Sequence, residues 1–108
     1  MTYVTLSLDF KNANAVREKA YDFFAEEQWE KLENVDTVWM IEYPSRYYND
    51  SEDVRKIHYN IASTLKKCAK DLDIERINYI IQVGNRKPIQ RQVVYQHGEY
   101  KEGAYVKP

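Results

Sequence analysis

Residues 3–10 read YVTLSLDF, and their strict alternation decides the fold of the chain. Apolar side chains occupy every second position, and more polar side chains occupy the positions between them. A period of two is typical of a β-strand with one face on the core and the other toward solvent. The segment therefore predicts a strand with Val4, Leu6, Leu8 and Phe10 on one face and Tyr3, Thr5, Ser7 and Asp9 on the other.

The segment after this strand is expected to form a helix that begins near Asn12 or Asn14. An asparagine side-chain oxygen can accept a free backbone N–H at a helix start. Apolar residues at helical spacing then continue, less regularly toward the end, to Leu32. Residues 35–43, VDTVWMIEY, are apolar on both faces and predict a second strand in the centre of the sheet.

The second half of the chain predicts one long helix and two more strands. The helix opens at Ser51, with two acidic residues in its first turn, and runs to about residue 71. Residues 75–83 and 89–97 predict strands joined by a turn. The last eleven residues, 98–108, are expected to be a loose tail, and the order of elements is β-α-β-α-β-β.

Both predicted helices are expected on the same face of the sheet. The polar positions of the first and third strands, such as Thr5, Ser7 and Arg76, would line a helix interface poorly. The sequence therefore predicts an α/β two-layer sandwich. Residues 1–97 would form a single domain, followed by the 98–108 tail.

The composition limits the class of protein. The chain has 108 residues, of which 44% are hydrophobic and 31% charged, which is typical of one globular domain. No apolar run reaches membrane-spanning length, and the N-terminus lacks the features of a signal peptide. The single cysteine, Cys68, cannot form an internal disulfide. We therefore expect a cytoplasmic protein that does not contact membranes.

Acidic residues gather in the first half of the chain. Residues 1–50 carry five Lys/Arg and ten Asp/Glu, whereas residues 51–108 carry eleven Lys/Arg and seven Asp/Glu. Four acids stand four residues apart, and two others widen the stripe that they would form on a helix: Glu18, Asp22, Glu26 and Glu30, with Glu27 and Glu33. Like charges at this spacing cost an isolated helix about 0.2–0.5 kcal/mol per pair, so helix stability does not explain the stripe.

Two main interpretations of the acidic stripe remain open. It could pair through solvent with the basic second helix, at about 0–1 kcal/mol per surface pair. It could instead steer a basic protein partner, itself a nucleic-acid-binding protein, toward this surface. The second interpretation, together with ten tyrosines, fits an inhibitor, immunity protein, antitoxin or phage anti-defence protein. Homodimerisation is a third arrangement that would use such a surface.

Six basic residues form a second candidate surface. Three stand on the second predicted helix and three flank the last hairpin: Lys66, Lys67 and Lys70, and Arg86, Lys87 and Arg91. They could contact phosphate groups. A net charge of −1 and a pI near 6.1 nevertheless argue against tight nonspecific binding of nucleic acid.

Sequence signals for catalysis and for cofactors are weak. His58 and His97 stand in different predicted elements, and the sequence has no His-x-x-x-His or Cys-x-x-Cys motif. His58 falls in the apolar register of its helix, which favours a core or boundary histidine over a ligand. Cys68 falls in the same register and is expected to be buried rather than nucleophilic. Three glycines leave no phosphate-binding loop, and no metal or cofactor is predicted.

Asp9 has the most distinctive position among the acids, because it ends the first strand on its polar face. The stretch TYVTLSLDF resembles the first strand of the ferredoxin-like family that includes the CRISPR adaptation nucleases and the GhoS-type antitoxin endoribonucleases. The resemblance implies a ferredoxin-like variant with an extra C-terminal hairpin strand. It also implies an alternative function, a metal-dependent endoribonuclease that acts as a symmetric dimer through Asp9. It covers nine residues, and PSRYYND stands where the family has a hairpin strand.

Overall fold

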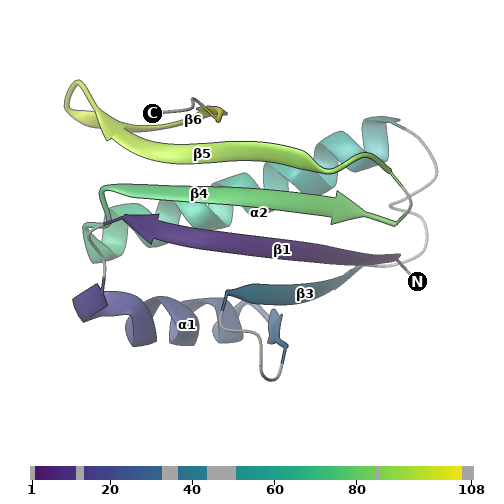
Figure 1. The fold of residues 1–108 in the computed structure, drawn as a ribbon, viewed down its shortest axis with the longest axis horizontal. Helices are drawn as coiled ribbons and strands as arrows, with labels where there is room; N and C mark the ends of the chain where they lie inside the picture. Colours follow the sequence, from purple (N-terminus) through teal and green to yellow (C-terminus); the bar gives the residue numbers. More distant parts are fainter. Residues whose placement is uncertain (1, 12–13, 33–36, 44–50, 85, 106–108) are drawn as a thin grey trace.

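The computed structural model describes residues 2–11, 14–32, 37–43, 51–84 and 86–105. These ranges form six strands, two α-helices and one 3-10 turn, η1 (Figure 1). In chain order the elements are β1 (Thr2–Lys11), η1 (Asn14–Val16), α1 (Arg17–Glu26), β2 (Glu30–Lys31), β3 (Val38–Tyr43), α2 (Ser51–Leu72), β4 (Arg76–Val83), β5 (Ile89–Gln96) and β6 (Glu99–Ala104).

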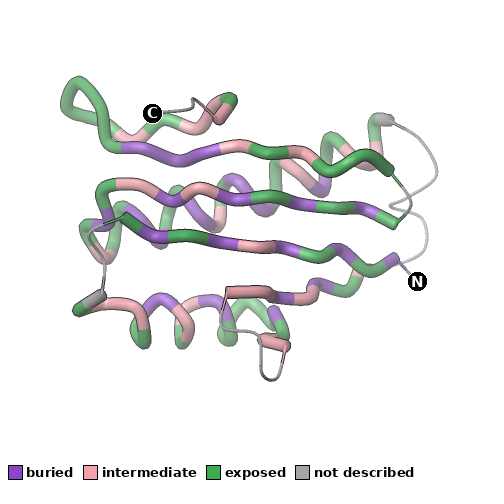
Figure 2. The backbone as a smooth tube through the Cα atoms, viewed as in Figure 1, coloured by how far each residue is buried: buried purple, intermediate pink, exposed green. Residues whose placement is uncertain are grey.

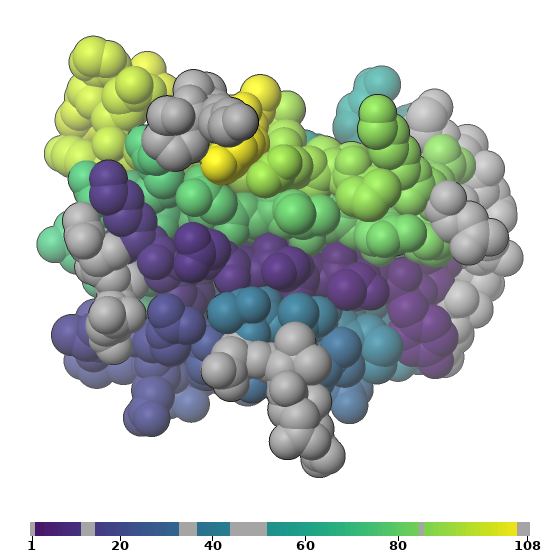
Figure 3. Space-filling view, viewed as in Figure 1, coloured from purple at the N-terminus to yellow at the C-terminus, as the bar shows by residue number. Residues whose placement is uncertain are grey.

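The strands form one sheet in the order β2-β3-β1-β4-β5-β6, with every neighbouring pair antiparallel. Figure 1 shows α1 and α2 behind the same face of this sheet. Within the described ranges no helix covers the other face, which we call the open face, and Figure 3 shows atoms of β1 and β4 at its surface. The predicted α/β two-layer architecture is therefore confirmed. The predicted element order is wrong, because β2 and β6 make it β-α-β-β-α-β-β-β.

The first strand occupies the centre of the sheet, between β3 and β4. Its residues alternate between buried and exposed positions along its length (Figure 2), as the period of two predicts. The register sets the apolar residues of β4 opposite those of β1, for example Tyr79 opposite Leu8 and Ile81 opposite Leu6. The apolar sides of both central strands thus face the helices.

The core lies between this sheet face and the two helices. Phe24 of α1 is fully buried, stacks on Trp29 at a ring-centroid distance of 5.0 Å, and meets Trp39 edge-on at 5.4 Å. Ile61 and Leu65 of α2 are also fully buried. Of the predicted core residues, Phe23 is half-buried. The others are all buried: Val4, Leu6, Leu8, Phe10, Phe24, Ile61 and Leu65.

The first helix ends earlier than predicted, at Glu26 instead of near Leu32. Gln28 has a φ of 69°, and the backbone N–H of Trp29 donates to the Phe24 carbonyl oxygen at 3.1 Å. This turn brings the Trp29 ring onto Phe24, and the chain then enters β2. Burial of a large aromatic side chain outweighs the helical pattern at this point.

The second predicted strand corresponds to β3, which lies next to the edge of the sheet and not at its centre. The edge strand β2 pairs with the outer side of β3, with Glu30 opposite Met40 and Lys31 opposite Trp39. Residues 35–36 of the predicted strand and the connector 44–50 lie outside the described residues.

The long helix and the strand after it follow the prediction, since α2 spans Ser51–Leu72 and β4 spans Arg76–Val83. The helix ends where Asp73 adopts a φ of 56° and the N–H of Ile74 donates to the Ala69 carbonyl oxygen at 2.9 Å. Of the predicted caps, Asn12 and the side chains of Asn14 and Ser51 lie outside the described part. No helix in the described ranges has the length and apolar character that crossing a membrane requires.

The predicted loose tail contains a sixth strand. His97 and Gly98 both have positive φ, 55° and 83°, which is the geometry of a two-residue hairpin turn. β6 then runs back along β5, from Glu99 opposite Gln96 to Ala104 opposite Arg91. The sequence EYKEGA lacks apolar alternation because polar contacts hold this strand to the rest of the fold.

Candidate functional site

The acidic surface consists of the five described acids Glu18, Asp22, Glu26, Glu27 and Glu30, all of them exposed. The first three share one face of α1, away from the buried Ala20 and Phe24. Glu30 lies in β2, so the prediction of a single helical stripe through Glu30 is wrong. β2 contacts α1, so Glu30 extends the acidic surface from a neighbouring element. Glu33 lies outside the described residues.

Among the residues that the structure describes, none of these five carboxylates makes an ion pair. α1 does contact α2, but the lysines of α2 form no direct bridge to the acidic surface in those ranges. In the described ranges, no direct contact therefore supports the interpretation in which the acidic stripe pairs with the second helix.

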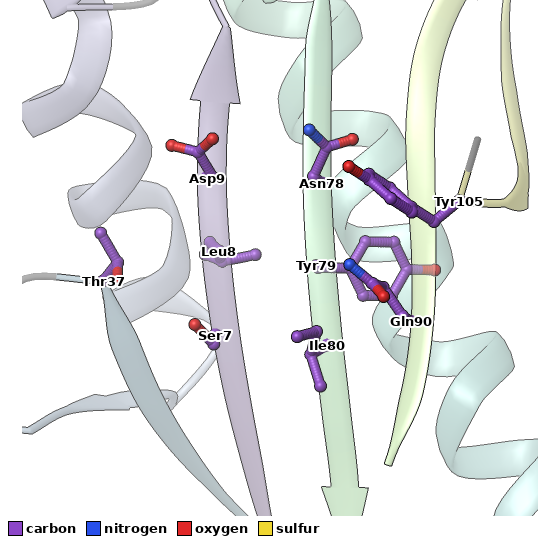
Figure 4. A pocket seen from close by; sticks show the side chains of 9 residues that line it. All are labelled: Ser7, Leu8, Asp9, Thr37, Asn78, Tyr79, Ile80, Gln90 and Tyr105. Carbon is purple, nitrogen blue, oxygen red and sulfur yellow. The ribbon is translucent and has the colours of Figure 1, made fainter. Parts of the chain in front are cut away.

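A hollow of about 380 Å³ lies on the open face beside Asp9 (Figure 4). Asp9 of β1 and Asn78 of β4 are register partners, and Figure 4 shows them on adjoining strands with Tyr105 on the far side of Asn78. The hollow is lined by Ser7, Leu8, Asp9, Thr37, Asn78, Tyr79, Ile80, Gln90 and Tyr105.

The polar lining of this hollow combines a carboxylate with hydroxyl and amide side chains. Among the described residues that line it, Asp9 supplies the only carboxylate. The Oδ1 atom of Asn78, and the Oε1 atom of Gln92 opposite it on β5, are buried without a hydrogen-bond partner in the described part. A carboxylate beside unpaired amide oxygens suits a donor group or a cation.

A divalent metal ion needs more ligands than Asp9 alone provides. In the described ranges no group of three His, Cys, Asp or Glu side chains comes together. In the dimer that the first-strand resemblance implies, a second copy of Asp9 would add a ligand to such a site.

The predicted second surface is divided by the fold. Lys66, Lys67 and Lys70 are exposed near the end of α2, whereas Arg86 and Lys87 are exposed beyond the far end of β4 (Figure 1). Arg91 belongs to neither group, because its side chain lies on the helix side of the sheet and binds Glu102. The prediction that these six side chains share one surface is wrong, since the length of β4 separates them.

A polar cluster that the sequence did not predict joins α2 to three strands. The Arg91 guanidinium donates to both Glu102 carboxylate oxygens, with Nε to Oε1 at 2.7 Å and Nη2 to Oε2 at 3.1 Å. The Tyr79 hydroxyl donates to Glu102 Oε1 at 3.0 Å. The Nε2 atom of His58 stands 3.3 Å from the Tyr79 hydroxyl and 3.4 Å from Glu102 Oε1.

The environment of this cluster shifts the pKa values of its members. Burial raises the pKa of Tyr79 strongly, and the neighbouring Glu102 carboxylate raises it further, so the phenol stays protonated. Burial works against the charged form of Glu102, but hydrogen bonds from Arg91 and Tyr79 outweigh it and lower the pKa of Glu102. The cluster thus holds an ionised carboxylate between fixed donors, and it anchors β6 to α2.

Two sequence signals could have indicated this cluster. Tyr79 stands in the register of Ile77 and Ile81, and Arg91 falls between Ile89 and Val93 on the same face of β5. An arginine in an apolar register requires a buried acceptor. The acceptor, Glu102, lies in the segment that was predicted to be a tail, so the sequence pattern did not identify it as the partner of Arg91.

The predictions for His58 and Cys68 are confirmed. His58 is a boundary residue with 20% of its side chain exposed, next to the buried Tyr79 hydroxyl. Cys68 is fully buried, and burial, with a smaller contribution from Asp71, raises the pKa of its thiol to about 12. A thiol with this pKa is a packing group rather than a nucleophile.

Comparison of the chain with protein-family models, with curated proteins and with solved structures found no significant match.

Proposed function

We propose that this protein is a small non-enzymatic binding protein whose acidic surface engages a basic protein partner. One observation carries the proposal: the five carboxylates of the acidic surface are exposed, and none makes an ion pair in the described part of the chain. Unpaired like charges repel one another, and a basic partner would relieve that repulsion. Such a surface would suit an inhibitor, immunity protein, antitoxin or phage anti-defence protein of the cytoplasm.

The proposal includes a finer description of the fold as a ferredoxin-like variant. The first six major elements, β1 to β4 with α1 and α2, follow the order β-α-β-β-α-β, and β5 and β6 extend the sheet beyond β4. The short β2 stands where that fold places a longer edge strand. A binding role fits this architecture, since the acidic surface is built on α1 and the adjoining edge strand.

The partner can be identified by differential capture from a lysate of the host. The variant Asp22→Lys, Glu26→Lys, Glu30→Lys reverses three charges of the acidic surface while Glu18 stays in the first turn of α1, where it favours the helix dipole. We expect wild-type protein to capture a basic protein that this variant does not capture.

The matched control reverses three exposed acids elsewhere that stand outside the first turn of a helix, Glu42, Asp71 and Glu99, and changes the net charge by the same amount. It should retain the partner. Loss of the partner from both variants would show that total charge, not the acidic surface, governs binding.

The alternative function, a metal-dependent endoribonuclease, is favoured by the Asp9 hollow alone. In the described part of the chain the hollow offers one carboxylate among neutral side chains, which is a poor metal site, so we expect purified protein to show no RNA cleavage above background with Mn²⁺ or Mg²⁺. Asp9→Asn should behave identically. Metal-dependent cleavage by the wild type that Asp9→Asn abolishes, with the fold unchanged, would replace the binding proposal with this alternative.

A further inference from the structure

A groove runs between α2 and the β5–β6 hairpin, on the helix side of the sheet. It consists of two hollows of about 460 Å³ and 180 Å³ that share Lys66 as a lining residue. The larger is lined by Lys66, Lys70, Tyr95, Gly98, Glu99 and Tyr100. The smaller is lined by Tyr59, Ala62, Ser63, Lys66 and Glu102. We call the two together the α2–β6 groove.

One side of the groove is a single stripe of α2. Tyr59, Ser63, Lys66 and Lys70 follow a spacing of four, three and four residues, which places them along one face of the helix. At a rise of about 1.5 Å per residue the stripe is roughly 16 Å long. It therefore offers an exposed aromatic ring at one end and two lysines, one helical turn apart, at the other.

The other side of the groove carries an aromatic pair. The rings of Tyr95 and Tyr100 meet edge to face, with centroids 5.1 Å apart and planes at 62°. Tyr95 is 51% exposed, which is high for a side chain of this size held against a neighbour. Burial and the nearby Asp73 carboxylate raise the pKa of Tyr100, so this phenol adds no negative charge to the groove.

The charges of the groove favour an anion at its lysines. Among the described residues that line the larger hollow, Glu99 is the one carboxylate, and Lys101 pairs with it at 3.6 Å. Glu102 in the smaller hollow is neutralised by Arg91. Lys66 and Lys70 make no ion pair in the described ranges. In the described part of the chain, two ammonium groups without an ion-pair partner therefore stand beside an exposed ring, with the Asp73 carboxylate near Tyr100.

We propose that the α2–β6 groove binds a nucleotide unit, with its phosphate between Lys66 and Lys70 and its base stacked on Tyr95. Ammonium groups bind phosphate as point charges, and an aromatic side chain stacks on a base of any sequence. The unit can come from a free nucleotide or from a short single strand. A strand would extend along the stripe toward Tyr59. The site does not depend on the acidic surface, which lies on α1 and β2.

The test titrates full-length protein with adenosine monophosphate, with single-stranded tri-adenylate and with inorganic phosphate, at several salt concentrations. We expect both adenine ligands to bind more tightly than inorganic phosphate. Contact with one phosphate would give a slope of about −0.7 for the logarithm of the affinity of tri-adenylate against the logarithm of salt concentration, which is the usual contribution of one neutralised phosphate of a single strand. Tighter binding of tri-adenylate than of the monophosphate identifies a strand as the source, and equal binding identifies a free nucleotide.

Three variants assign the binding to the groove. Lys66→Ala with Lys70→Ala should abolish most of the salt dependence, whereas Lys67→Ala, an exposed lysine of the same helix outside the groove, should leave it unchanged. Tyr95→Ala should weaken adenine ligands at least about fivefold, the lower limit for loss of one stacking ring, without affecting inorganic phosphate. The melting temperature of each variant reports whether it is folded.

Several results would overturn the proposal. The protein could fail to bind both adenine ligands, or it could bind inorganic phosphate as tightly as adenosine monophosphate. Lys67→Ala could also lower the affinity for the adenine ligands as much as the double variant Lys66→Ala with Lys70→Ala. Preferential binding of a phosphotyrosine peptide would also overturn it. The acidic-surface variant Asp22→Lys, Glu26→Lys, Glu30→Lys should keep its nucleotide affinity, so the two proposals can fail separately.

Discussion

Replacing Phe24 with alanine is expected to lower the free energy of unfolding by about 3–5 kcal/mol, the usual cost of removing a buried phenylalanine ring. Phe24 has no exposed surface and touches the rings of Phe10, Trp29 and Trp39. Its loss would leave a cavity beneath β1 and β3 and would release the turn that carries Trp29 into the core. Urea denaturation followed by circular dichroism measures the change. A domain of this kind has a total stability of about 5–15 kcal/mol, so the loss is a large fraction of the total and the variant should melt at a clearly lower temperature.

The neighbouring Phe23 provides the matched control. It is half-buried and meets Phe24 edge-on at 6.3 Å. Phe23→Ala should therefore cost clearly less than Phe24→Ala. Equal losses at the two positions would contradict the assignment of Phe24 to the centre of the aromatic core.

Replacing Glu102 with glutamine is expected to destabilise the protein by about 1–3 kcal/mol at neutral pH, because the Arg91 guanidinium loses its charged acceptor. The effect should depend on pH with a defined sign. The folded state lowers the pKa of Glu102 below its ordinary value of 4.5, so its contribution is present above that value. It is lost as pH falls through the folded-state pKa, because protonation then favours unfolding.

The measurement is the free energy of unfolding of the wild type and Glu102→Gln between pH 7 and pH 3. The difference between them should shrink toward acid. Glu99→Gln is the control, since Glu99 lies on the same strand but pairs with Lys101 at an exposed position. If the difference in free energy of unfolding between wild type and Glu102→Gln stayed constant or grew toward pH 3, Glu102 would not be stabilised as a carboxylate in the folded state.

The sequence predicts the elements whose stability comes from apolar burial. The alternation of residues 3–10 located β1 and its buried face, and the helical register of Ile61, Leu65 and Cys68 located α2. Both patterns follow from placing apolar side chains on one side of a regular element. They also predicted that α1 and α2 would lie on the same face of the sheet.

The elements that the sequence missed are held by other forces. β6 is anchored by Glu102, which binds Arg91 and Tyr79, so EYKEGA shows no apolar alternation. The two-residue β2 is too short for a period, and α1 ends where the burial of Trp29 overrides helical spacing. Such features depend on contacts between distant parts of the chain, which a local pattern does not contain.

The candidate sites divide in the same way. Exposed charges on regular elements, such as Glu18 and Asp22 on α1 or Lys66 and Lys70 on α2, were identified from spacing and lie where the helices place them. Arg91 was assigned to the wrong surface because its acceptor comes from the unpredicted β6. The α2–β6 groove was not foreseen for the same reason, since one of its sides is the β5–β6 hairpin.

The rate of association with the captured partner, measured against ionic strength, tests the central proposal most directly. Wild type and the variant Asp22→Lys, Glu26→Lys, Glu30→Lys are compared at low salt and at 0.15 M and above, where the screening length falls to about 8 Å or less. We predict slower association of the variant at low salt, a difference that narrows as salt rises, and a nearly unchanged melting temperature. Association rates that are equal at low salt would contradict the proposal that the acidic surface engages the partner.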